Sequence, residues 1–502
     1  MTALKTSADI TLLLEGSYPF VRGGVSSWVH QLIEGLPEFR FALVYLGAER
    51  PTREEVRYAL PPNVCSLQCH YLMEGAKSSP PSARTGEPAY FAASAKLHDW
   101  FRNPQGAPDS ELLAQVVLQN GQSGTQCMQD FFHSQAAWAQ ITDSYSRHCP
   151  DASFHSYFWA VRNMHTPLMK LAAIARTVAP SRIFHSVSTG YAGLLGAMLR
   201  QQTGQPLLLT EHGIYTKERK IELQSLFLRE QQGWFKSLPE AGMEHYDLMW
   251  MRLFEGIGRL VYAQADPIIA LYEQNRQRQI RDGAAAARTR IIPNGVDVAR
   301  FAPLRARRAD KTPLVLGLVG RIVPIKDIKT FIRAIGVLSV QLPEVQGWLI
   351  GPEEEDPAYV QECKALVRSL GLEDRIRFLG FQKVEDVLPQ LGLLVLTSIS
   401  EAFPLAILES HASGLPVLAT DVGACRDLIE GREPADWTLG LAGEVVPIVD
   451  HAALAHAAFG LLTQPLRWRA AQQAGIARVE RYYQQSRVID SYRDIYHSMG
   501  ER

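Results

Sequence analysis

Two cationic residues in the second half of the chain are placed to bind a diphosphate. Arg321 and Lys326 belong to the segment GRIVPIKD, between an apolar run that ends at Val319 and a helical pattern that begins near Asp327. A loop can bring both cations to one point, and the start of a helix adds a positive dipole there. Together they would stabilise the charge of a departing diphosphate. The alternative is a solvated loop with two surface cations.

Two carboxylates further along the chain could hold the hydroxyl groups of a sugar or a ribose. Glu401 and Glu409 belong to the segment SEAFPLAILE. Pro404 suits the first position of a helix, which predicts Glu401 on a loop and Glu409 inside the helix. Carboxylates accept strong hydrogen bonds from such hydroxyls. The alternative is a helix that carries exposed acids.

A glycine pair and a histidine in the first half could contribute to the same kind of site. Gly23 and Gly24 follow an apolar run and open a helical pattern, where backbone N–H groups could approach an anion or a sugar closely. His212 directly follows another apolar run, which predicts a position at a strand end. A histidine there could line a cleft, or it could be a core residue with satisfied hydrogen bonds.

The sequence lacks the usual signatures of metal and nucleotide cofactors. No two aspartates are separated by one residue, no GxxxxGK[ST] loop occurs, and no GxGxxG follows a strand. Cys65, Cys69 and His70 are close in sequence, but a fourth ligand at suitable spacing is missing. We therefore expect these two cysteines to be ordinary thiols in a strand, and Arg321 and Lys326 to replace a divalent cation. No metal or cofactor is expected.

The elements that must position these residues alternate between strands and helices. The first half begins with a strand at Ile10–Leu14, a glycine turn, a helix from Ser26 and a strand at Phe41–Leu46, which predicts a parallel, doubly wound sheet. The expected elements that follow are the helix Leu168–Ala179, the strand Ile183–Val187, a helix at 192–202, the strand Leu207–Thr210, a helical segment at 217–262 and the strand Pro267–Leu271.

A second α/β cycle fills the rest of the chain. Its expected strands are Leu314–Val319, Trp348–Ile350, Ile376–Leu379, Leu393–Leu396, Val417–Ala419 and Gly443–Val446. Its expected helices are Asp327–Leu338, 357–370, 384–391, 404–413 and several within 450–500. Residues 298–311 should form a charged connector, and two such halves predict a deep cleft between them.

Residues from about 65 to 150 do not fit this alternation, and we interpret them as an insertion in the first half. Its segment 77–88 is polar and rich in proline and serine, which predicts a loop. We expect the insertion to recruit a partner or an acceptor. The alternative is a structural cover over the first sheet.

Length and charge limit the class of protein. With 502 residues the chain should contain two large domains or about three smaller ones. Lys and Arg number 51 and Asp and Glu 52, a balance that argues against binding to nucleic acid or anionic membranes by bulk charge. No apolar run reaches the roughly 18–20 residues of a membrane-spanning helix. The first ten residues lack the apolar segment of a signal peptide, so we expect a cytoplasmic protein.

Taken in order, the motifs resemble those of a known enzyme family. The order is GGV, the histidine at a strand end, IPNGVD, the Arg/Lys loop, the two glutamates and SGLPVLAT. This set covers most of residues 10–430 and resembles the retaining glycosyltransferases of the family-4 type, with the GT-B fold. The segments 15–30 and 210–220 are more specific and are similar to the PelF-type transferases of Pel exopolysaccharide synthesis in bacterial biofilms.

The resemblance implies an architecture of two Rossmann-like lobes with a cleft between them. Residues 1–300 would form the acceptor-side lobe, and residues 301–480 the lobe that binds the nucleotide-sugar. The insertion at about 65–150 would belong to the first lobe, and a C-terminal helix at 480–502 would pack back on that lobe.

The resemblance also implies a role for each candidate residue. Arg321 and Lys326 would bind the donor diphosphate, Glu409 the ribose hydroxyls and Glu401 the donor sugar. The remaining expected positions are Gly23 and Gly24 near the phosphates or acceptor, His212 at the sugar, Gly351 and Phe381 at the base, and the backbone of Phe403, Pro404 and Leu405 near the sugar. Many relatives have GFG where this chain has Ala402-Phe403-Pro404, so the sugar contacts remain open.

The implied activity is transfer of a hexose from a UDP-sugar, with UDP-glucose as the first candidate, to a growing exopolysaccharide. The anomeric configuration would be retained, without a metal. The implied partners are the acceptor polysaccharide and the inner-membrane Pel synthesis and export proteins, which would hold a cytoplasmic chain at the membrane. Two alternatives stay open: a UDP-sugar 2-epimerase, and a non-catalytic UDP-sugar-binding subunit that regulates a membrane synthase.

Overall fold

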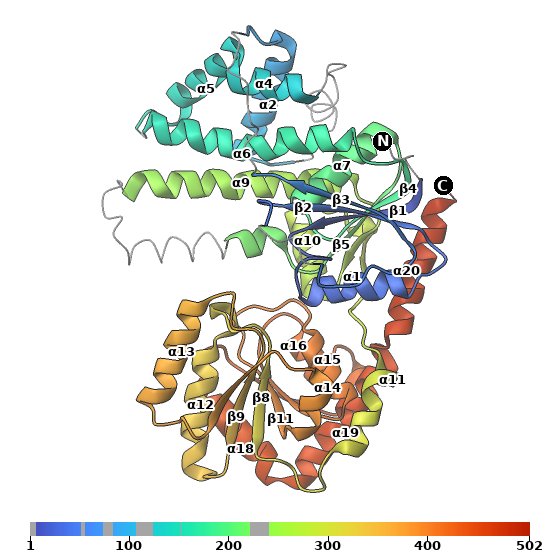
Figure 1. Ribbon diagram of the computed structural model, residues 1–502, viewed down its shortest axis with the longest axis vertical. Helices are drawn as coiled ribbons and strands as arrows, with labels where there is room; N and C mark the ends of the chain where they lie inside the picture. The colour runs from blue at the N-terminus through green and yellow to red at the C-terminus, as the bar shows by residue number, and fades with distance from the viewer. Residues whose placement is uncertain are drawn as a thin grey trace. The chain divides into compact units, whose positions relative to one another are not determined.

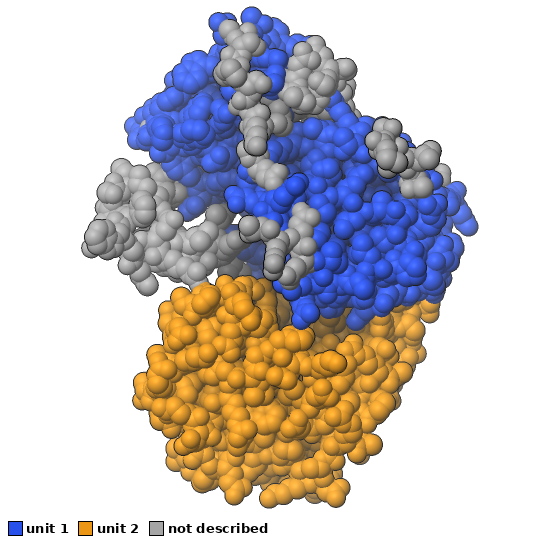
Figure 2. All heavy atoms as spheres, viewed as in Figure 1, with its two compact units in different colours: residues 1–292, 493–502 blue, residues 293–492 orange. Residues whose placement is uncertain are grey.

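The chain folds into two compact units, each built on a parallel β-sheet (Figure 1). The computed structural model describes residues 7–51, 56–73, 84–106, 124–151, 153–220 and 240–501. Unit 1 comprises residues 1–292 and 493–502, and unit 2 comprises residues 293–492 (Figure 2). No helix among the described residues has the length and apolar character needed to cross a membrane.

Unit 1 contains a seven-stranded sheet in the order β3-β2-β1-β4-β5-β6-β7, and all strand pairs are parallel. The strands form where apolar runs can be buried on both faces, as in most parallel sheets. Their bounds are β1 Ala8–Glu15, β2 Phe41–Gly47, β3 Val64–Tyr71, β4 Ser181–Ser186, β5 Leu207–Glu211, β6 Ile268–Ala270 and β7 Thr289–Ile291.

The expected start of the insertion was wrong. Residues 64–71 form β3, which pairs with β2, so this stretch belongs to the sheet. A strand was expected around Cys65 and Cys69, but its mostly half-buried side chains include polar residues, so it was not assigned to the sheet. Cys65 and Cys69 lie in a strand, as expected, and neither forms a disulfide with a described residue. β7 was also missed, because two of its three residues, Thr289 and Arg290, are polar and give no apolar run.

The helical insertion lies between β3 and β4. It packs into the same core as the sheet through side chains such as Phe91, Leu97, Phe101 and Phe131, so it covers apolar surface of unit 1. Its helices are α2 Pro88–Arg102, α4 Gly124–His133, α5 Gln135–His148 and α6 Phe154–Ala175. Most of the polar loop expected at 77–88 lies outside the described residues, which resume at Arg84. The Arg84 side chain donates to Asp130 and Gln129 on α4.

The remaining helices of unit 1 flank the sheet. They are α1 Gly24–Glu34, α7 Tyr191–Thr203, α9 Glu240–Gln264 and α10 Glu273–Asp282. The helical segment expected at 217–262 corresponds in part to α9, and its residues 221–239 lie outside the described part of the chain. The helix expected at 168–179 is the second half of α6, which begins at Phe154 and ends at Ala175.

Unit 2 contains a six-stranded parallel sheet in the order β10-β9-β8-β11-β12-β13. Its strands are β8 Val315–Val319, β9 Gln346–Ile350, β10 Ile376–Gly380, β11 Leu393–Leu396, β12 Val417–Thr420 and β13 Gly443–Val446. The longer helices are α12 Ile328–Gln341, α13 Pro357–Ser369, α15 Leu405–Ala412, α18 His451–Thr463 and α19 Pro465–Tyr482, and the short ones are α11 Val298–Phe301, α14 Val384–Val387, α16 Cys425–Glu430 and α17 Pro434–Trp437. All six expected strands are confirmed, and α16 and α17 were not expected.

The expected connector at 298–311 is part of unit 2. Arg305 donates to the carbonyl of Ala412 and forms an ion pair with Glu480, which fixes this segment to the body of unit 2. Unit 2 begins at Pro293 because Val296 exchanges backbone hydrogen bonds with residues 483 and 485. The expected boundary was 300/301.

The last helix, α20 Gln485–Gly500, has its final residues in unit 1. The Arg493 side chain donates to Glu38 and to the carbonyl of Gly35. Tyr496 Oη lies 2.7 Å from His185 Nδ1 on β4. The final helix therefore begins at 485 rather than 480, and residues 493–502 complete the core of unit 1.

Candidate functional site in unit 2

The structure brings together two of the predicted site residues at one edge of the second sheet. Lys326 follows β8 and Glu401 follows β11, and these two strands are hydrogen-bonded neighbours. Because their carboxyl ends meet at the same edge, Lys326 Nζ forms an ion pair with Glu401 Oε1. Ser398 Oγ donates to the same carboxylate oxygen at 2.6 Å. Sequence reasoning missed Ser398, although its place three residues before Glu401 was a usable signal.

Short hydrogen bonds fix the two loops to each other. Thr397 Oγ1 donates to the carbonyl of Lys326 at 2.8 Å, and the Ile399 N–H donates to the carbonyl of Ile325 at 2.9 Å. Behind them, Thr420 Oγ1 donates to the carbonyl of Ser398 at 2.6 Å. The lysine and the carboxylate are thus held in place by their backbones as well as by their charges.

Asp327 is the N-cap of α12 and has an unusual backbone conformation. It has a φ of 45°, in the left-handed region, and its carboxylate accepts the Thr330 N–H that caps the helix. A non-glycine residue rarely adopts this conformation without support from its surroundings. The strained position sits directly after Lys326, where the chain turns from the strand end into the helix.

Arg321 lies on the same loop as Lys326 and contacts a different carboxylate. Its Nη1 donates to both carboxylate oxygens of Glu355, at 2.6 and 2.8 Å, and both side chains are about half exposed. Glu355 lies on the loop after β9. Each of the two predicted diphosphate-binding cations is therefore paired with an acid in this structure.

Glu409 lies on α15 and is partly buried. Burial raises the pKa of its carboxyl to about 7; the negative charge of Glu385 adds to this shift, and the positive charge of Arg300 opposes it. Its carboxyl makes no hydrogen bond with the described residues. Arg300 is instead paired with Glu385. A carboxyl group in this state has free acceptor capacity for the hydroxyls of a ligand.

Gly351 lets two strand ends of this edge approach each other closely. A Cβ on Gly351 would lie 1.8 Å from the carbonyl oxygen of Gly320, so no side chain fits there. The Gly320 N–H donates to the carbonyl of Ile350, and the Gly351 N–H donates to that of Gly380. The next residue, Phe381, is 61% exposed. Gly351 is thus required by the packing of the edge itself.

The segment after Glu401 differs in one detail from the prediction. Pro404 is the N-cap of α15, and the helix begins at Leu405, because Pro404 keeps an extended ψ of 115°. The Phe403 ring is buried against Tyr483, at 5.8 Å between centroids. Asn294 Nδ2 donates to the carbonyl of Phe403 at 3.2 Å, which fixes the backbone of this turn.

The predicted residues of unit 1 lie at the carboxyl edge of its own sheet. α1 begins at Gly24 with Gly23 as its N-cap, and no side chain caps this end. A Cβ on either glycine would meet nothing within 4 Å, so packing within unit 1 does not require glycine there.

His212 follows β5 and is buried. Its ring packs edge-on against Trp28, with centroids 4.4 Å apart, and burial lowers its pKa to about 3. Its Nε2 atom is buried and makes no hydrogen bond with the described residues. The histidine is therefore neutral, and the interpretation as a fully satisfied core residue does not account for its free nitrogen.

Two carboxylates at strand ends of unit 1, the buried Glu211 and the partly buried Glu15, were not predicted. Glu211 accepts hydrogen bonds from the Thr189 and Tyr262 hydroxyls, from Gln279 and from the Tyr215 N–H. Burial raises its pKa. Glu15, at the end of β1, accepts from the Tyr215 hydroxyl at 2.8 Å. Each is the last residue of an apolar strand, a signal that could have indicated it, and each fixes the loops around that strand end.

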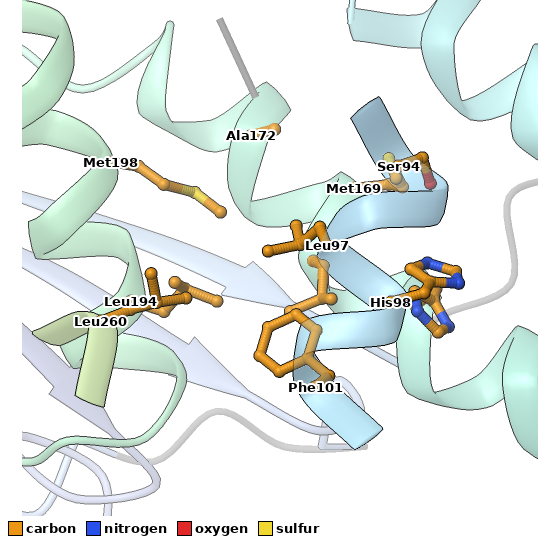
Figure 3. Close-up of a pocket in the computed structure, with 11 residues that line it drawn as sticks. Ser94, Leu97, His98, Phe101, Met169, Ala172, Leu194, Met198 and Leu260 are labelled. Carbon is orange, nitrogen blue, oxygen red and sulfur yellow. The ribbon is translucent and has the colours of Figure 1, made fainter. Parts of the chain in front are cut away.

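A small apolar cavity elsewhere in unit 1 does not belong to this site. It lies among α2, α6, α7 and α9, and Figure 3 shows side chains such as Leu97, Phe101, Met198 and Leu260 directed into it. His98 and His165 lie at its side with their rings 3.9 Å apart. Burial lowers the pKa of His165 to about 4, so its imidazole is neutral at pH 7.

Two family models match the chain. The model "Domain of unknown function (DUF3492)" matches residues 8–287, and the model "Glycosyl transferases group 1" matches residues 313–464. The second match includes Arg321, Lys326, Glu401 and Glu409. The two matches divide the chain in the same region as the two compact units.

Curated relatives share part of the chain. D-inositol 3-phosphate glycosyltransferase of Actinosynnema mirum is 28% identical over 274 residues, which cover 50% of this chain and 61% of the relative. The enzymes of the same name from Kineococcus radiotolerans and Salinispora tropica are 32% and 33% identical, over 45% and 39% of this chain and 56% and 46% of theirs. The chain thus spans about half the length of the curated relatives it matches.

Solved structures share the fold across nearly the whole chain. Anabaena Alr3699/HepE in complex with UDP and glucose matches with a TM-score of 0.60 and 15% identity, covering 98% of this chain and 100% of that one. Sucrose-phosphate synthase from Thermosynechococcus elongatus matches with a TM-score of 0.58 and 20% identity, covering 97% and 98%. These likenesses confirm the predicted GT-B fold of two Rossmann-like domains.

Proposed function

Because the chain belongs to the DUF3492 family and its second unit matches the glycosyl transferases group 1 model, we propose that it is a glycosyltransferase that uses a UDP-sugar. The observation that carries the proposal is the contact of Lys326 and Ser398 with Glu401 at neighbouring strand ends. That edge is where ligands of open α/β sheets bind. The neighbour from Anabaena, solved with UDP and glucose, supports UDP-glucose as the first donor to test.

We propose the following division of roles in unit 2. Arg321 and Lys326 bind the diphosphate, and the donor replaces Glu355 and Glu401 as the partner of each cation. Glu401, released from Lys326, accepts hydrogen bonds from the donor sugar. Glu409, whose carboxyl has no partner among the described residues, accepts them from the ribose. Gly351 and Phe381 flank the base.

In the proposed reaction the bond between the sugar and the phosphate ionises. The two cations stabilise the negative charge of the departing UDP, an effect that is strongest in a site shielded from water. The acceptor hydroxyl attacks from the same face, which retains the anomeric configuration, and a β-phosphate oxygen takes its proton. Neither a protein nucleophile nor a metal ion is required.

The finer part of the proposal concerns the acceptor. The similarity of segments 15–30 and 210–220 to the PelF-type transferases supports a growing exopolysaccharide as acceptor. Inner-membrane Pel synthesis and export proteins would then be the partners. His212, with its unpartnered nitrogen, and the open backbone at Gly23 and Gly24 are the groups of unit 1 that we assign to the sugar and the acceptor.

The proposal is tested by incubating the purified chain with radiolabelled UDP-sugars, with and without EDTA. Release of UDP with transfer of the label, unchanged by EDTA, is the expected result. Conversion to the epimeric UDP-sugar would identify an epimerase instead. Binding without any turnover would identify a regulatory subunit, and loss of transfer in EDTA that Mg²⁺ or Mn²⁺ restores would contradict the metal-free mechanism.

A further inference from the structure

An aromatic surface with one arginine at its centre lies on the helical insertion of unit 1. Two of its tryptophans are unusually open to solvent, Trp138 at 55% and Trp159 at 46% exposure. Large aromatic side chains are normally buried, and exposed ones that gather on one surface mark an interaction site. We name this set the aromatic–arginine surface; its members are Phe132 on α4, Trp138 on α5, and Phe154, Phe158, Trp159 and Arg162 on α6.

The rings of this surface are continuous. Trp138 lies 5.6 Å from Phe154 and 6.1 Å from Phe158, between ring centroids, and Phe158 lies 5.5 Å from Trp159. The planes of these pairs are inclined by 77°, 54° and 82°. Phe154 and Phe158 also pack on a small core formed by Ile141, Cys149, Tyr157 and Val161. The exposed tryptophans therefore sit on a supported, stepped surface rather than on a flat platform.

Arg162 provides an unpaired positive charge among these rings. Its guanidinium carbon lies 4.3 Å from the centroid of Phe132, 5.9 Å from Phe158 and 5.7 Å from Trp159. Its guanidinium makes no hydrogen bond or ion pair with any residue that the structure describes. Burial lowers the pKa of Arg162, and no carboxylate among the described residues offsets this shift. An arginine held this way offers rigid donors that suit a carboxylate.

The aspartates of the neighbouring helices do not fill this role, because they are already paired. Asp130 on α4 accepts from Arg84, and Asp143 on α5 forms an ion pair with Arg147. These pairs cancel their own charges and leave Arg162 as the positive centre of the surface. Charge complementarity therefore requires an anionic group on whatever binds there.

We infer that the aromatic–arginine surface is a docking site for an acidic segment of a partner protein, with an Asp or Glu side chain on Arg162 and apolar side chains on Trp138 and Trp159. Tryptophan and arginine are the residues that most often dominate protein–protein interfaces. A single arginine is too little for an anionic membrane, whose recognition takes a cluster of several cations. The steep angles between the rings do not favour the stacking of a flat sugar chain.

The test uses the full chain and a phage-displayed library of random peptides. We expect selection of peptides in which Asp or Glu adjoins Leu, Ile or Phe. Arg162→Gln should weaken the binding of the synthesised peptides about tenfold to a hundredfold, since a charge-assisted hydrogen bond is lost. Trp138→Ala and Trp159→Ala should also weaken it. The matched control is Arg147→Gln, an arginine of α5 that is already paired, which should bind like the parent.

Three results would overturn the inference. Selected peptides could be neutral or basic, or they could bind Arg162→Gln as tightly as the parent. The third result is that acidic peptides do not bind the chain, whereas vesicles of anionic lipid or an oligosaccharide do, and that Trp138→Ala weakens this binding. Thermal unfolding followed by circular dichroism checks that each variant folds like the parent. If a tryptophan variant does not fold, the comparison of Arg162→Gln with Arg147→Gln decides the test. UDP binding should be equal in all folded variants, since unit 2 is unchanged.

Discussion

At the scale of single residues, the main finding is that the predicted cations are already neutralised by carboxylates. Lys326 contacts Glu401, which is itself a predicted ligand of the donor sugar, and Arg321 contacts the exposed Glu355. An exposed ion pair such as Arg321–Glu355 contributes little to stability, at most about 1 kcal/mol. In the proposed mechanism an incoming diphosphate would therefore displace Glu355 from Arg321 at small cost, and Lys326 would couple donor binding to the release of Glu401.

The first prediction concerns the cations. Arg321→Ala and Lys326→Ala should each weaken UDP binding about tenfold to a hundredfold, because each removes a hydrogen bond to a charged group. Isothermal titration calorimetry with UDP measures this directly. Lys329→Ala is the matched control, since that lysine lies on α12 and is paired with Glu362. Unchanged UDP affinity in both test variants would refute the diphosphate assignment.

The second prediction separates the two carboxylates. Glu409→Ala should weaken the binding of UDP and of the UDP-sugar alike, because the ribose is part of both ligands. Glu401→Ala should leave UDP binding unchanged or tighter, because it frees Lys326, and should weaken only the UDP-sugar. Calorimetry with both ligands distinguishes the cases. If the two variants show the same loss for UDP and UDP-sugar, the assigned roles are wrong.

The third prediction follows from the raised pKa of Glu409. A carboxyl whose pKa in the folded state lies near 7, above its ordinary value of 4.5, makes the folded protein less stable as pH rises from 4.5 through 7. Glu409→Gln should therefore raise the thermal unfolding midpoint of unit 2 at pH 8 and change it little at pH 5. The same substitution should weaken UDP binding at pH 8. A variant no more stable than the parent at pH 8 would show that Glu409 is not penalised by burial.

At the scale of elements, the carboxyl edge of the second sheet depends on the close approach of its strands. A glycine directly follows β8 and β9 and is the last residue of β10, and the loops at this edge carry Arg321, Glu355 and Phe381. The geometry of the edge, rather than any single side chain, thus decides where the candidate ligands lie.

The fourth prediction tests this edge. Gly351→Ala would place a methyl group 1.8 Å from the carbonyl oxygen of Gly320, so the backbone must shift. We expect a loss of UDP binding of at least tenfold and a lower unfolding midpoint for unit 2. Gly336→Ala on α12 is the control, since its methyl group would make only a normal contact with Leu372, and alanine favours the helix. Parent-like binding in Gly351→Ala would show that the edge tolerates the shift.

At the scale of the whole molecule, the end of the sequence completes unit 1. Tyr496 reaches His185 from the end of the chain, and His185 Nε2 lies 2.9 Å from Thr210 Oγ1 on the next strand. Burial lowers the pKa of His185 to about 3, so this chain of contacts is uncharged at neutral pH. The C-terminal residues are therefore structural parts of unit 1.

The fifth prediction concerns this long-range contact. Tyr496→Phe removes the hydroxyl that lies 2.7 Å from Nδ1 of buried His185 and should cost unit 1 about 1–3 kcal/mol. Denaturant unfolding followed separately for the two units should show a lower midpoint for unit 1 only. UDP affinity should not change, because the proposed donor residues lie in unit 2. An unchanged midpoint for unit 1 would mean that water or another group replaces the tyrosine hydroxyl.

The sequence by itself determined the local order of elements and the position of the candidate residues within it. Strands buried on both faces need unbroken apolar runs, and runs such as 10–14, 41–46 and 393–396 predicted their strands closely. Loops between such runs must lie at sheet edges, so Arg321, Lys326 and Glu401 could be assigned to strand ends. The strand around Cys65 and Cys69 was expected but was placed in the insertion, because its half-buried surface carries polar side chains and a local pattern cannot reveal that it pairs with β2.

Only the tertiary structure decided which of these residues meet. The order β9-β8-β11 places Lys326 beside Glu401, although the two residues are far apart in sequence, and Arg321 pairs with Glu355 from the other side. Strand order depends on how helices pack over both faces of the sheet, which is a property of the whole unit and not of any segment. The same holds for His185 and Tyr496, since a contact between the fourth strand and the last helix leaves no trace in local periodicity.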